Sequence, residues 1–326
     1  MYYTDLSLLR DRMNRLCADA QSFLFVINYE RTEGYLVEDP PNRSEVFYKF
    51  PTVQNKPFPK SLDKKVQFAV RPNSVADYKR KFDKLHKHLT NGEIALANLT
   101  ERTEIETNLS LEEIFALSES SYQIYIPDRF VCFSPERFVR IADGVISANP
   151  MKGTIDAATP DAEQIILNDP KEIAEHGATV TLLCDELRPI ADNVRAVRFR
   201  YIDRLRTNRK DLLQVSSEIV GDLPPDYLQR MGDIIFSLLP AGSIAGTPKQ
   251  RAAEILHDIE GRERGFYCGV AGYFDGRELD SAVLIRFIEQ DSKGKSYFRS
   301  GGGVTADSIC EREYDEVLNK IYLPFA

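Results

Sequence analysis

Residues 122–150, YQIYIPDRFVCFSPERFVRIADGVISANP, decide the fold class that the sequence indicates. Their β-branched and aromatic residues predict strands in YQIYIP and RFVCFS, followed by a hairpin in PERFVRIADGVISANP that turns at Ala142, Asp143 and Gly144. These strands follow one another along the chain without a helix between them. Together with similar blocks of strands elsewhere, this order favours an α+β fold with mostly antiparallel sheet over a doubly wound parallel fold.

The N-terminal part of the chain is also predicted to be rich in strands. SFLFVINYE (22–30) and GYLVE (34–38) indicate a hairpin, and VQFAVRP (66–72) indicates a further strand. We expect residues 1–75 to form a short β-rich layer packed on the same fold as residues 76–326. The chain would then be one structural domain.

Helices are predicted between the blocks of strands. Tyr78, Phe82, Leu85 and Leu89 recur at helical spacing behind Ser74, which is a suitable N-cap. Further helices are predicted in SLEEIFALSESS (110–121), which opens with a capping box, and in DPKEIAEHGATVTLLCDELRPIA (169–191), PPDYLQRMGDIIFSLL (224–239), QRAAEILHDIEGRER (250–264) and CEREYDEVLNKIYLPF (310–325).

The composition is that of a globular protein and argues against several functions. Of the 326 residues, 43% are hydrophobic and 28% charged, and the net charge of −8 disfavours nonspecific binding of nucleic acid. No apolar run reaches the length of a membrane-spanning helix, and residues 1–15 contain no apolar signal core. The five cysteines are scattered and suggest neither a zinc site nor a disulfide framework. We therefore expect a cytoplasmic, reduced protein.

Two acidic helix faces are candidates for binding a metal ion. Glu172 and Glu175 are three residues apart, as are Glu313 and Glu316, and each pair shares one face of its predicted helix. If the two faces meet across a cleft, their carboxylates suit a hard cation such as Mg²⁺. Charges at this spacing are also common on solvated helix faces, so the residues alone leave both interpretations open.

Four shorter stretches contain residues that could act on a substrate. SPERF places Glu136 directly after a strand, where loss of contact with water would let it hold its proton and act as an acid. NPMKGT places Lys152 between a rigid proline and a permissive glycine. SGGGV (300–304) could expose backbone N–H groups to an anion, and PAGSIAGTPK (240–249) is predicted to be a glycine-containing loop. Taken alone, such stretches are more often surface turns.

Taken in order, these stretches resemble the chorismate-utilising enzymes, over roughly residues 75–326. The matching stretches are SPERF, NPMKGT, KEIAEH, PAGSIAGTPKQRAAEIL, RGFYCGVAGYF, IRF, SGGGVTADS and EREYDEVLNK. The resemblance implies a single α+β domain in which two facing, mostly antiparallel sheets with outer helices enclose a deep central cleft. The family includes anthranilate, isochorismate, salicylate and aminodeoxychorismate synthases.

Within this family, NPMKGT is most similar to aminodeoxychorismate synthase component I, the para-aminobenzoate synthase component. Anthranilate synthases carry alanine where Lys152 stands, and the resemblance implies that Lys152 is a nucleophile that attacks carbon 2 of the chorismate ring. It also implies that Glu136 protonates the departing hydroxyl at carbon 4 before ammonia adds there. Members that add water carry a lysine base where this chain has Leu96, which argues against isochorismate and salicylate synthase.

The same resemblance implies the remaining site residues and partners. Mg²⁺ would be held by Glu175 and Glu316, with Glu172 and Glu313 behind them, and would bind the ring carboxylate. The other carboxylate of chorismate would be bound by a set of basic, aromatic and backbone groups: Tyr267, Arg286, Lys320, Gly301, Gly302 and Gly303. Ammonia would come from a glutamine amidotransferase subunit. The expected role is amino-group transfer in the synthesis of p-aminobenzoate and folate.

Some positions depart from the family pattern. Gln214 stands where histidine is frequent, Ala245 stands where threonine or serine is usual, and TLLCDEL (181–187) replaces a run expected near the amidotransferase. One alternative to aminodeoxychorismate synthase is anthranilate synthase component I or another chorismate-converting enzyme. A chorismate-binding protein without catalysis is the alternative from a different class, although binding alone requires neither Lys152 nor Glu136.

Overall fold

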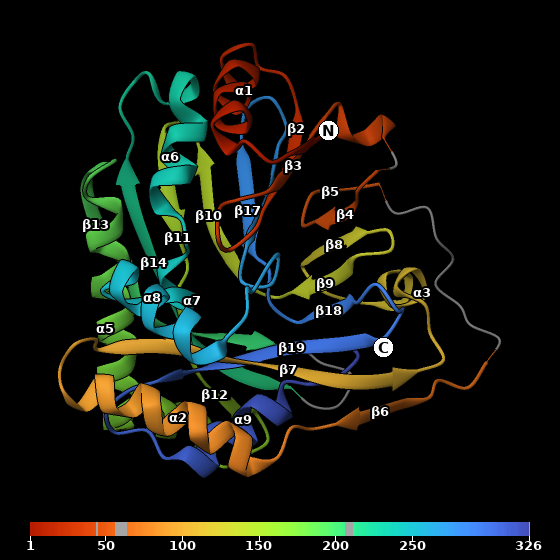
Figure 1. Ribbon diagram of the computed structural model, residues 1–326. Helices are drawn as coiled ribbons and strands as arrows, with labels where there is room; N and C mark the ends of the chain where they lie inside the picture. Colours follow the sequence, from red (N-terminus) through yellow and green to blue (C-terminus); the bar gives the residue numbers. More distant parts are fainter. Residues whose placement is uncertain (44, 56–63, 206–210, 326) are drawn as a thin grey trace.

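The structure, a computed structural model, describes residues 1–43, 45–55, 64–205 and 211–325, and its strands form two antiparallel sheets (Figure 1). The first sheet has ten strands, in the order β1 (Tyr2–Tyr3), β3 (Gly34–Glu38), β2 (Phe23–Ile27), β16 (Val270–Phe274), β17 (Leu279–Val283), β10 (Arg137–Ala142), β11 (Val145–Ala148), β14 (Leu212–Asp222) and β12 (Met151–Asp156), with β13 (Asp192–Leu205) also paired to β14.

The second sheet has nine strands and lies across the first (Figure 1). Its order is β15 (Gly246–Thr247), β7 (Leu96–Thr107), β19 (Ser296–Val304), β18 (Phe287–Gln290), β9 (Phe130–Ser134), β8 (Tyr122–Ile126), β4 (Phe47–Phe50) and β5 (Val53–Gln54), with β6 (Phe68–Arg71) also paired to β7. The expected α+β fold with facing antiparallel sheets is confirmed.

The segment 122–150 supplies strands to both sheets. β8 and β9 pair with each other in the second sheet, and β10 and β11 pair in the first. The chain therefore passes from one sheet to the other at Pro135 and Glu136. This passage places Glu136 where the two sheets meet, which the sequence pattern of consecutive strands did not reveal.

The strands of the first 75 residues are divided between the two sheets. β1, β2 and β3 belong to the first sheet, and β4, β5 and β6 belong to the second. The predicted hairpin of β2 and β3 is confirmed, with Phe25 opposite Leu36. The prediction of a β-rich layer missed the helix α1 (Leu6–Ala18), whose buried Leu9, Met13 and Leu16 recur at helical spacing.

The helices lie around the two sheets (Figure 1). Besides α1 they are α2 (Val75–Thr90), α3 (Leu111–Leu117), α4 (Ala162–Asn168), α5 (Pro170–Leu187), α6 (Met231–Leu238), α7 (Gly242–Ala245), α8 (Lys249–Glu260) and α9 (Cys310–Asn319). The short helix α7 lies within PAGSIAGTPK, which was predicted to be a loop. Among the described residues, no helix has the length and apolarity that crossing a membrane requires.

Two helix starts agree closely with their sequence signals. The side chain of Ser74 accepts a hydrogen bond from the backbone of Asp77, and Ser110 and Glu113 form a complete capping box. The apolar stripe of α2 packs with α8 and α9 against β7 in one hydrophobic cluster. This cluster holds the outer side of β7, so that its inner side faces the other sheet.

A buried ion pair between Arg264 and Glu260 connects the second sheet to α7 and α8. The Arg264 guanidinium contacts both carboxylate oxygens of Glu260 at 3.0 and 2.8 Å, and it donates to the carbonyl oxygens of Asn98 on β7 and Ile244 on α7. Glu260 also accepts a hydrogen bond from the backbone of Thr100. Each of the three guanidinium nitrogens therefore has a partner, as burial of a charge requires.

We predict that Glu260→Gln lowers the free energy of unfolding by about 3–5 kcal/mol, because it leaves the buried guanidinium without its carboxylate. Urea denaturation followed by circular dichroism measures this change. The matched control is Glu254→Gln on the same helix, where an exposed carboxylate contacts Arg251 at 3.4 Å. The control should change stability by less than about 0.5 kcal/mol, and equal effects of the two substitutions would contradict the prediction.

Candidate active site

A cavity of about 280 Å³ lies between the two sheets. The first sheet contributes residues of β10, β11, β12 and β14 to its lining, and the second contributes residues of β7 and β19. Helices α5, α7 and α9 close it with Thr179, Ser243 and Glu316, among others. Of the predicted site residues, those that line this cavity are Glu136, Lys152, Tyr267, Arg286, Gly301, Gly303, Glu316 and Lys320.

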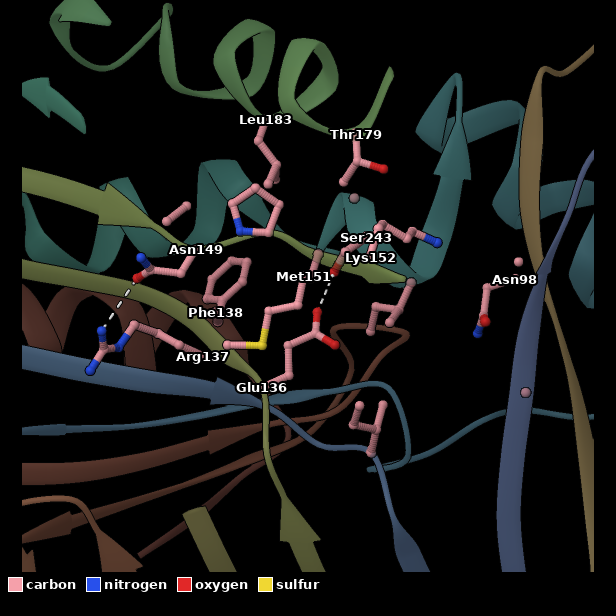
Figure 2. Close-up of a pocket in the computed structure, with 18 of the residues that line it drawn as sticks. Asn98, Glu136, Arg137, Phe138, Asn149, Met151, Lys152, Thr179, Leu183 and Ser243 are labelled. Atoms are coloured by element: carbon pink, nitrogen blue, oxygen red, sulfur yellow. Dashed lines mark hydrogen bonds between the residues drawn. The ribbon is translucent and has the colours of Figure 1, made fainter. Parts of the chain in front are cut away.

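Glu136 enters the cavity at the passage between the sheets. Ser243 on α7 donates a hydrogen bond of 3.0 Å to its Oε1 atom, which Figure 2 shows as a dashed line. Removal from water raises the pKa of the Glu136 carboxyl, against the opposing effects of the Ser243 hydrogen bond and the charge of Lys152. The carboxyl therefore keeps its proton to higher pH than an exposed glutamate and can serve as an acid.

Lys152 approaches the same cavity from β12, at the edge of the first sheet. The pairing of β12 with β14 is irregular between Met151 and Thr154, where a bulge interrupts the ladder. Gly153, in this bulge, has a φ of 79°, a conformation that glycine adopts readily. The Nζ atom of Lys152 lies 3.8 Å from the position that a Cβ on Gly303 of the opposite sheet would occupy. The bulged strand thus places the lysine amine close to the opposite sheet.

Two further predicted residues line the cavity, Arg286 just before β18 and Lys320 just after α9. Arg286 has a φ of 56°, which is uncommon for a residue with a side chain, and its Nε donates to the Tyr322 hydroxyl at 3.3 Å. Lys320 donates to the carbonyl oxygen of Gly301 and to Glu316, both at 2.7 Å, and burial lowers the pKa of its ammonium. These two cations make this end of the cavity attractive to a carboxylate.

Tyr267 lies buried beneath the guanidinium of Arg299, whose centre is 5.2 Å from the ring centroid. Burial raises the pKa of the Tyr267 hydroxyl well above its usual value. The hydroxyl therefore remains a hydrogen-bond donor over the physiological pH range. A protonated hydroxyl of this kind can donate a hydrogen bond to an anionic oxygen.

The predicted glycine run forms the end of β19. Gly301, Gly302 and Gly303 pair with β7, whereas β18 pairs with β19 only from Ser296 to Arg299. In the described part of the chain, the side of the glycine run opposite β7 therefore has no strand partner. Alternate backbone N–H groups of an unpaired edge are available to a ligand.

The four predicted metal-binding glutamates lie as two pairs on separate helices. On α9, Glu313 is buried and accepts from Ser308 at 2.8 Å, and a Cβ on Gly302 would lie 3.4 Å from Glu313 and 3.8 Å from Glu316. On α5, a Cβ on Gly153 would lie 2.6 Å from Glu172, next to Lys152.

These pairs do not form a single cluster in the structure. Within residues 1–43, 45–55, 64–205 and 211–325, no group of three or more histidine, cysteine, aspartate or glutamate side chains is arranged to hold a metal ion. Glu172, Glu175 and Glu313 are also outside the cavity lining, and of the four only Glu316 belongs to it. The chemistry of the donors nevertheless fits a hard cation, because all four predicted ligands are carboxylates.

Sequence reasoning missed several residues of the cavity. Ser243 and Asn98 line it, and Arg137 lines it while its guanidinium bonds Asp280 and Asn149. The sequence offered one signal for Ser243, which is that its hydroxyl lies within the glycine-containing stretch PAGSIAGTPK that resembles the family. Gln214, which stands where the family frequently has histidine, lines the cavity. Leu96, which stands where members that add water carry a lysine, also lines it.

The comparisons with known proteins agree with this architecture. Residues 10–325 match the sequence profile of chorismate binding enzymes. The chain belongs to this family. Membership supports a chorismate-converting enzyme.

Individual relatives have several different names. The chain is 49% identical over 253 residues to an uncharacterised PabA-like protein of Pasteurella multocida, covering 78% of each chain. It is 41% identical over 308 residues to an uncharacterised PabA-like protein of Haemophilus influenzae, covering 93% of this chain and 92% of the relative. It is also 34% identical over 274 residues to anthranilate synthase component 1 of Acetivibrio thermocellus, covering 79% of this chain and 54% of the relative.

Among solved structures, the fold is similar to that of MenF, the menaquinone-specific isochorismate synthase of Escherichia coli. The TM-score is 0.75 at 18% identity, and the match covers 98% of this chain and 82% of MenF. At this identity the likeness establishes the fold of the chorismate binding family and not the reaction.

We predict that Arg286→Gln weakens chorismate binding by roughly 10- to 100-fold, because it removes one of the two basic groups that make this end of the cavity attractive to a carboxylate. Isothermal titration calorimetry in the absence of ammonia measures the affinity. Arg277→Gln, at an exposed turn between β16 and β17, is the matched control and should bind chorismate as the wild type does. Equal affinities of the wild type and Arg286→Gln would remove Arg286 from the substrate site.

Proposed function

We propose that this chain is aminodeoxychorismate synthase component I, a cytoplasmic enzyme that converts chorismate and ammonia to 4-amino-4-deoxychorismate for p-aminobenzoate and folate synthesis. The observation that carries the proposal is Lys152, which lines the cavity between the sheets within reach of Gly303. Anthranilate synthases carry alanine at this position. A lysine there provides a nucleophile that the anthranilate reaction does not use.

In the proposed reaction, the neutral amine of Lys152 forms a bond to carbon 2 of the chorismate ring while the hydroxyl at carbon 4 leaves as water. Glu136 donates the proton that this departure requires, and its raised pKa supports that role. Ammonia then forms a bond to carbon 4, and the bond between carbon 2 and the lysine nitrogen breaks. The covalent adduct divides one difficult displacement into two easier ones.

The binding groups of the cavity suit the two carboxylates of chorismate. Arg286 and Lys320, with Tyr267 and the free edge of the glycine run Gly301–Gly303, are proposed to hold the carboxylate of the enolpyruvyl group. Glu175 and Glu316, with Glu172 and Glu313 behind them, are proposed to hold Mg²⁺. When bound, the ion would supply positive charge for the ring carboxylate.

Leu96 supports amination over hydration. It lines the cavity, and its Cδ1 lies 3.4 Å from the position of a Cβ on Gly303, close to the Lys152 amine. Members of the family that add water carry a lysine base at this position, and a leucine cannot activate water. This residue supports an ammonia-using reaction over those of isochorismate and salicylate synthases.

The ammonia is proposed to come from a glutamine amidotransferase subunit. All five cysteines of this chain are buried, and burial raises the pKa of each thiol. A glutaminase nucleophile requires an accessible thiolate, so we assign none to this chain. Hydrolysis of glutamine is therefore proposed to occur on a separate partner.

The second candidate is anthranilate synthase component I. The observation that favours it is the 34% identity to an enzyme of that name. The two reactions use the same substrate and differ in the ring carbon that receives nitrogen. The mass and retention time of the product therefore separate them.

We predict that the wild type, given chorismate, Mg²⁺ and an ammonium salt, forms an amino-substituted product that retains the pyruvyl ether. Lys152→Ala should lower this rate by at least about a thousandfold, the scale on which removal of a nucleophile acts. Liquid chromatography with mass detection measures the product. Lys295→Ala, at an exposed ion pair with Glu104, is the control and should react normally.

Each alternative gives its own result in the same assay. Anthranilate as the product would establish the second candidate, and unchanged chorismate would favour a binding protein. Near-full activity of Lys152→Ala would contradict the nucleophile assignment.

We predict that Ser243→Ala shifts the alkaline limb of the pH profile of kcat/KM to higher pH. The acid acts in its protonated form, so the rate falls as pH rises through the pKa of Glu136. The Ser243 hydrogen bond lowers this pKa, so its loss raises the pKa further. Ser237→Ala on α6, whose hydroxyl donates to the backbone carbonyl of Ile234, should leave the profile unchanged. If the alkaline limb of Ser243→Ala stays at the same pH or moves to lower pH, Glu136 is not the acid that this limb reports.

A further inference from the structure

The short helix α7 brings Ser243 to Glu136, and the stretch that contains it is held together at its two ends. This stretch, residues 239–248, connects α6 to α8 (Figure 1). Lys249, the first residue of α8, donates a hydrogen bond of 2.8 Å to the carbonyl oxygen of Leu238, the last residue of α6. The two ends of the stretch are therefore joined across its base.

The C-terminal end of α7 has anchors of its own. The carbonyl oxygen of Ile244 accepts a hydrogen bond from the buried Arg264 guanidinium, and Gly246 and Thr247 pair with β7 as strand β15. These contacts fix the residues that follow Ser243. The first residue of α7, Gly242, is contacted instead by a side chain from α5.

That side chain is Glu186, near the end of α5, and its carboxylate lies directly against the backbone of Gly242. A Cβ atom at position 242 would lie 2.7 Å from Cδ and 2.9 Å from Oε2 of Glu186, and still closer to Oε1. Side-chain carbons do not approach other atoms so closely, so this contact requires glycine at position 242. Because the Glu186 side chain is only 11% exposed, the contact is shielded from most of the solvent.

Lys249 holds the Glu186 carboxylate in this place. Its Nζ atom lies 3.0 Å from Oε1, as an ion pair rather than as a directed hydrogen bond. Burial raises the pKa of the Glu186 carboxyl, while the Lys249 charge and a backbone hydrogen bond from Gly242 oppose that rise. Burial likewise lowers the pKa of the Lys249 ammonium against the opposing charge of Glu186. The same lysine therefore joins the ends of the stretch 239–248 and fixes the carboxylate that contacts its middle.

This contact explains one residue of a stretch that departs from the family pattern. Glu186 belongs to TLLCDEL (181–187), and so does its neighbour Asp185. Asp185 is exposed and forms an ion pair with Arg188 of the same helix, whereas Glu186 is largely buried and contacts α7. Adjacent carboxylates on one helix thus have different surroundings, which provides a matched pair of positions for an experiment.

We propose that Glu186 is a positioning residue that acts through α7. Its carboxylate holds Gly242, the first residue of α7, in place. The next residue, Ser243, consequently keeps its hydrogen bond of 3.0 Å to the Glu136 carboxyl. The inference rests on the proposed function only in taking Glu136 as the acid, and it requires neither the lysine adduct nor ammonia.

The direction in which the pKa of Glu136 moves separates this role from two others. The Ser243 hydrogen bond lowers that pKa, so loss of the position of Ser243 raises it. If Glu186 acted through its charge alone, removal of this negative charge would lower the pKa of Glu136. A role confined to folding would leave it unchanged. The three basic residues whose charges also lower the pKa of Glu136 are kept in every variant below: Lys152, Arg286 and Lys320.

The test is a carbon-13 NMR titration of protein labelled at the glutamate carboxyl carbons, in which the Glu136 resonance is the one that Glu136→Gln removes. In Glu186→Gln, the pKa of Glu136 should rise, as it should in Ser243→Ala. When Glu186→Gln is added to Ser243→Ala, no further rise is expected, because the hydrogen bond that Glu186 maintains is already absent. The measurement needs no turnover, so the positioning role and the proposed reaction can fail independently.

Asp185→Asn is the matched control, because it removes an exposed carboxylate from the adjacent residue of the same helix. It should leave the pKa of Glu136 unchanged. Gly242→Ala is a second variant, which serves if Glu186→Gln does not fold once Lys249 has lost its counter-charge. The added methyl group overlaps the Glu186 carboxylate while every charge is retained, so it should also raise the pKa of Glu136.

Two results would overturn the proposal. One is an unchanged or lowered pKa of Glu136 in Glu186→Gln, or in Gly242→Ala if Glu186→Gln does not fold. This result would limit Glu186 to folding or to an effect of its charge. The other is a further rise when Glu186→Gln is added to Ser243→Ala, which would show that Glu186 acts on Glu136 by a route other than Ser243.

Discussion

The buried Arg264–Glu260 ion pair is the interaction on which the geometry of the site depends. A guanidinium that is 2% exposed must satisfy its donors inside the protein, and it does so through Glu260 and the carbonyl oxygens of Asn98 and Ile244. Asn98 belongs to β7 and Ile244 to α7, and both line the cavity between the sheets. One charge that cannot remain unpaired therefore sets the spacing of two walls of this cavity.

The two sheets contribute different chemical groups to the cavity between them. The first sheet carries Lys152 on a bulged edge strand, and the second carries the glycine run of β19 with Arg286 and Lys320 nearby. Glu136 lies where the chain passes from one sheet to the other. An amine, an acid and two further basic side chains thus surround one space, although they belong to elements that are far apart in the sequence.

Comparison with other chorismate binding enzymes shows that the fold alone does not determine the reaction. The same two-sheet architecture occurs in an isochorismate synthase at 18% identity, so the fold by itself does not select water or ammonia as the second substrate. The proposed selectivity depends on a few side chains in the cavity, above all Lys152 and Leu96. A leucine in place of a basic residue changes which small nucleophile can be activated, while the surrounding sheets remain the same.

The sequence by itself determined the local elements and the family. The stripe of α2 behind Ser74, the capping box of α3 and the hairpin of β2 and β3 all depend on residues within a few positions of one another, and these predictions are confirmed. Only the tertiary structure decided that the chain changes sheets at Glu136 and that Ser243, 107 residues away, bonds to it. Local spacing and propensity specify helices and strands, but contacts between distant residues depend on the order in which the strands join their sheets, and no short-range pattern encodes that order.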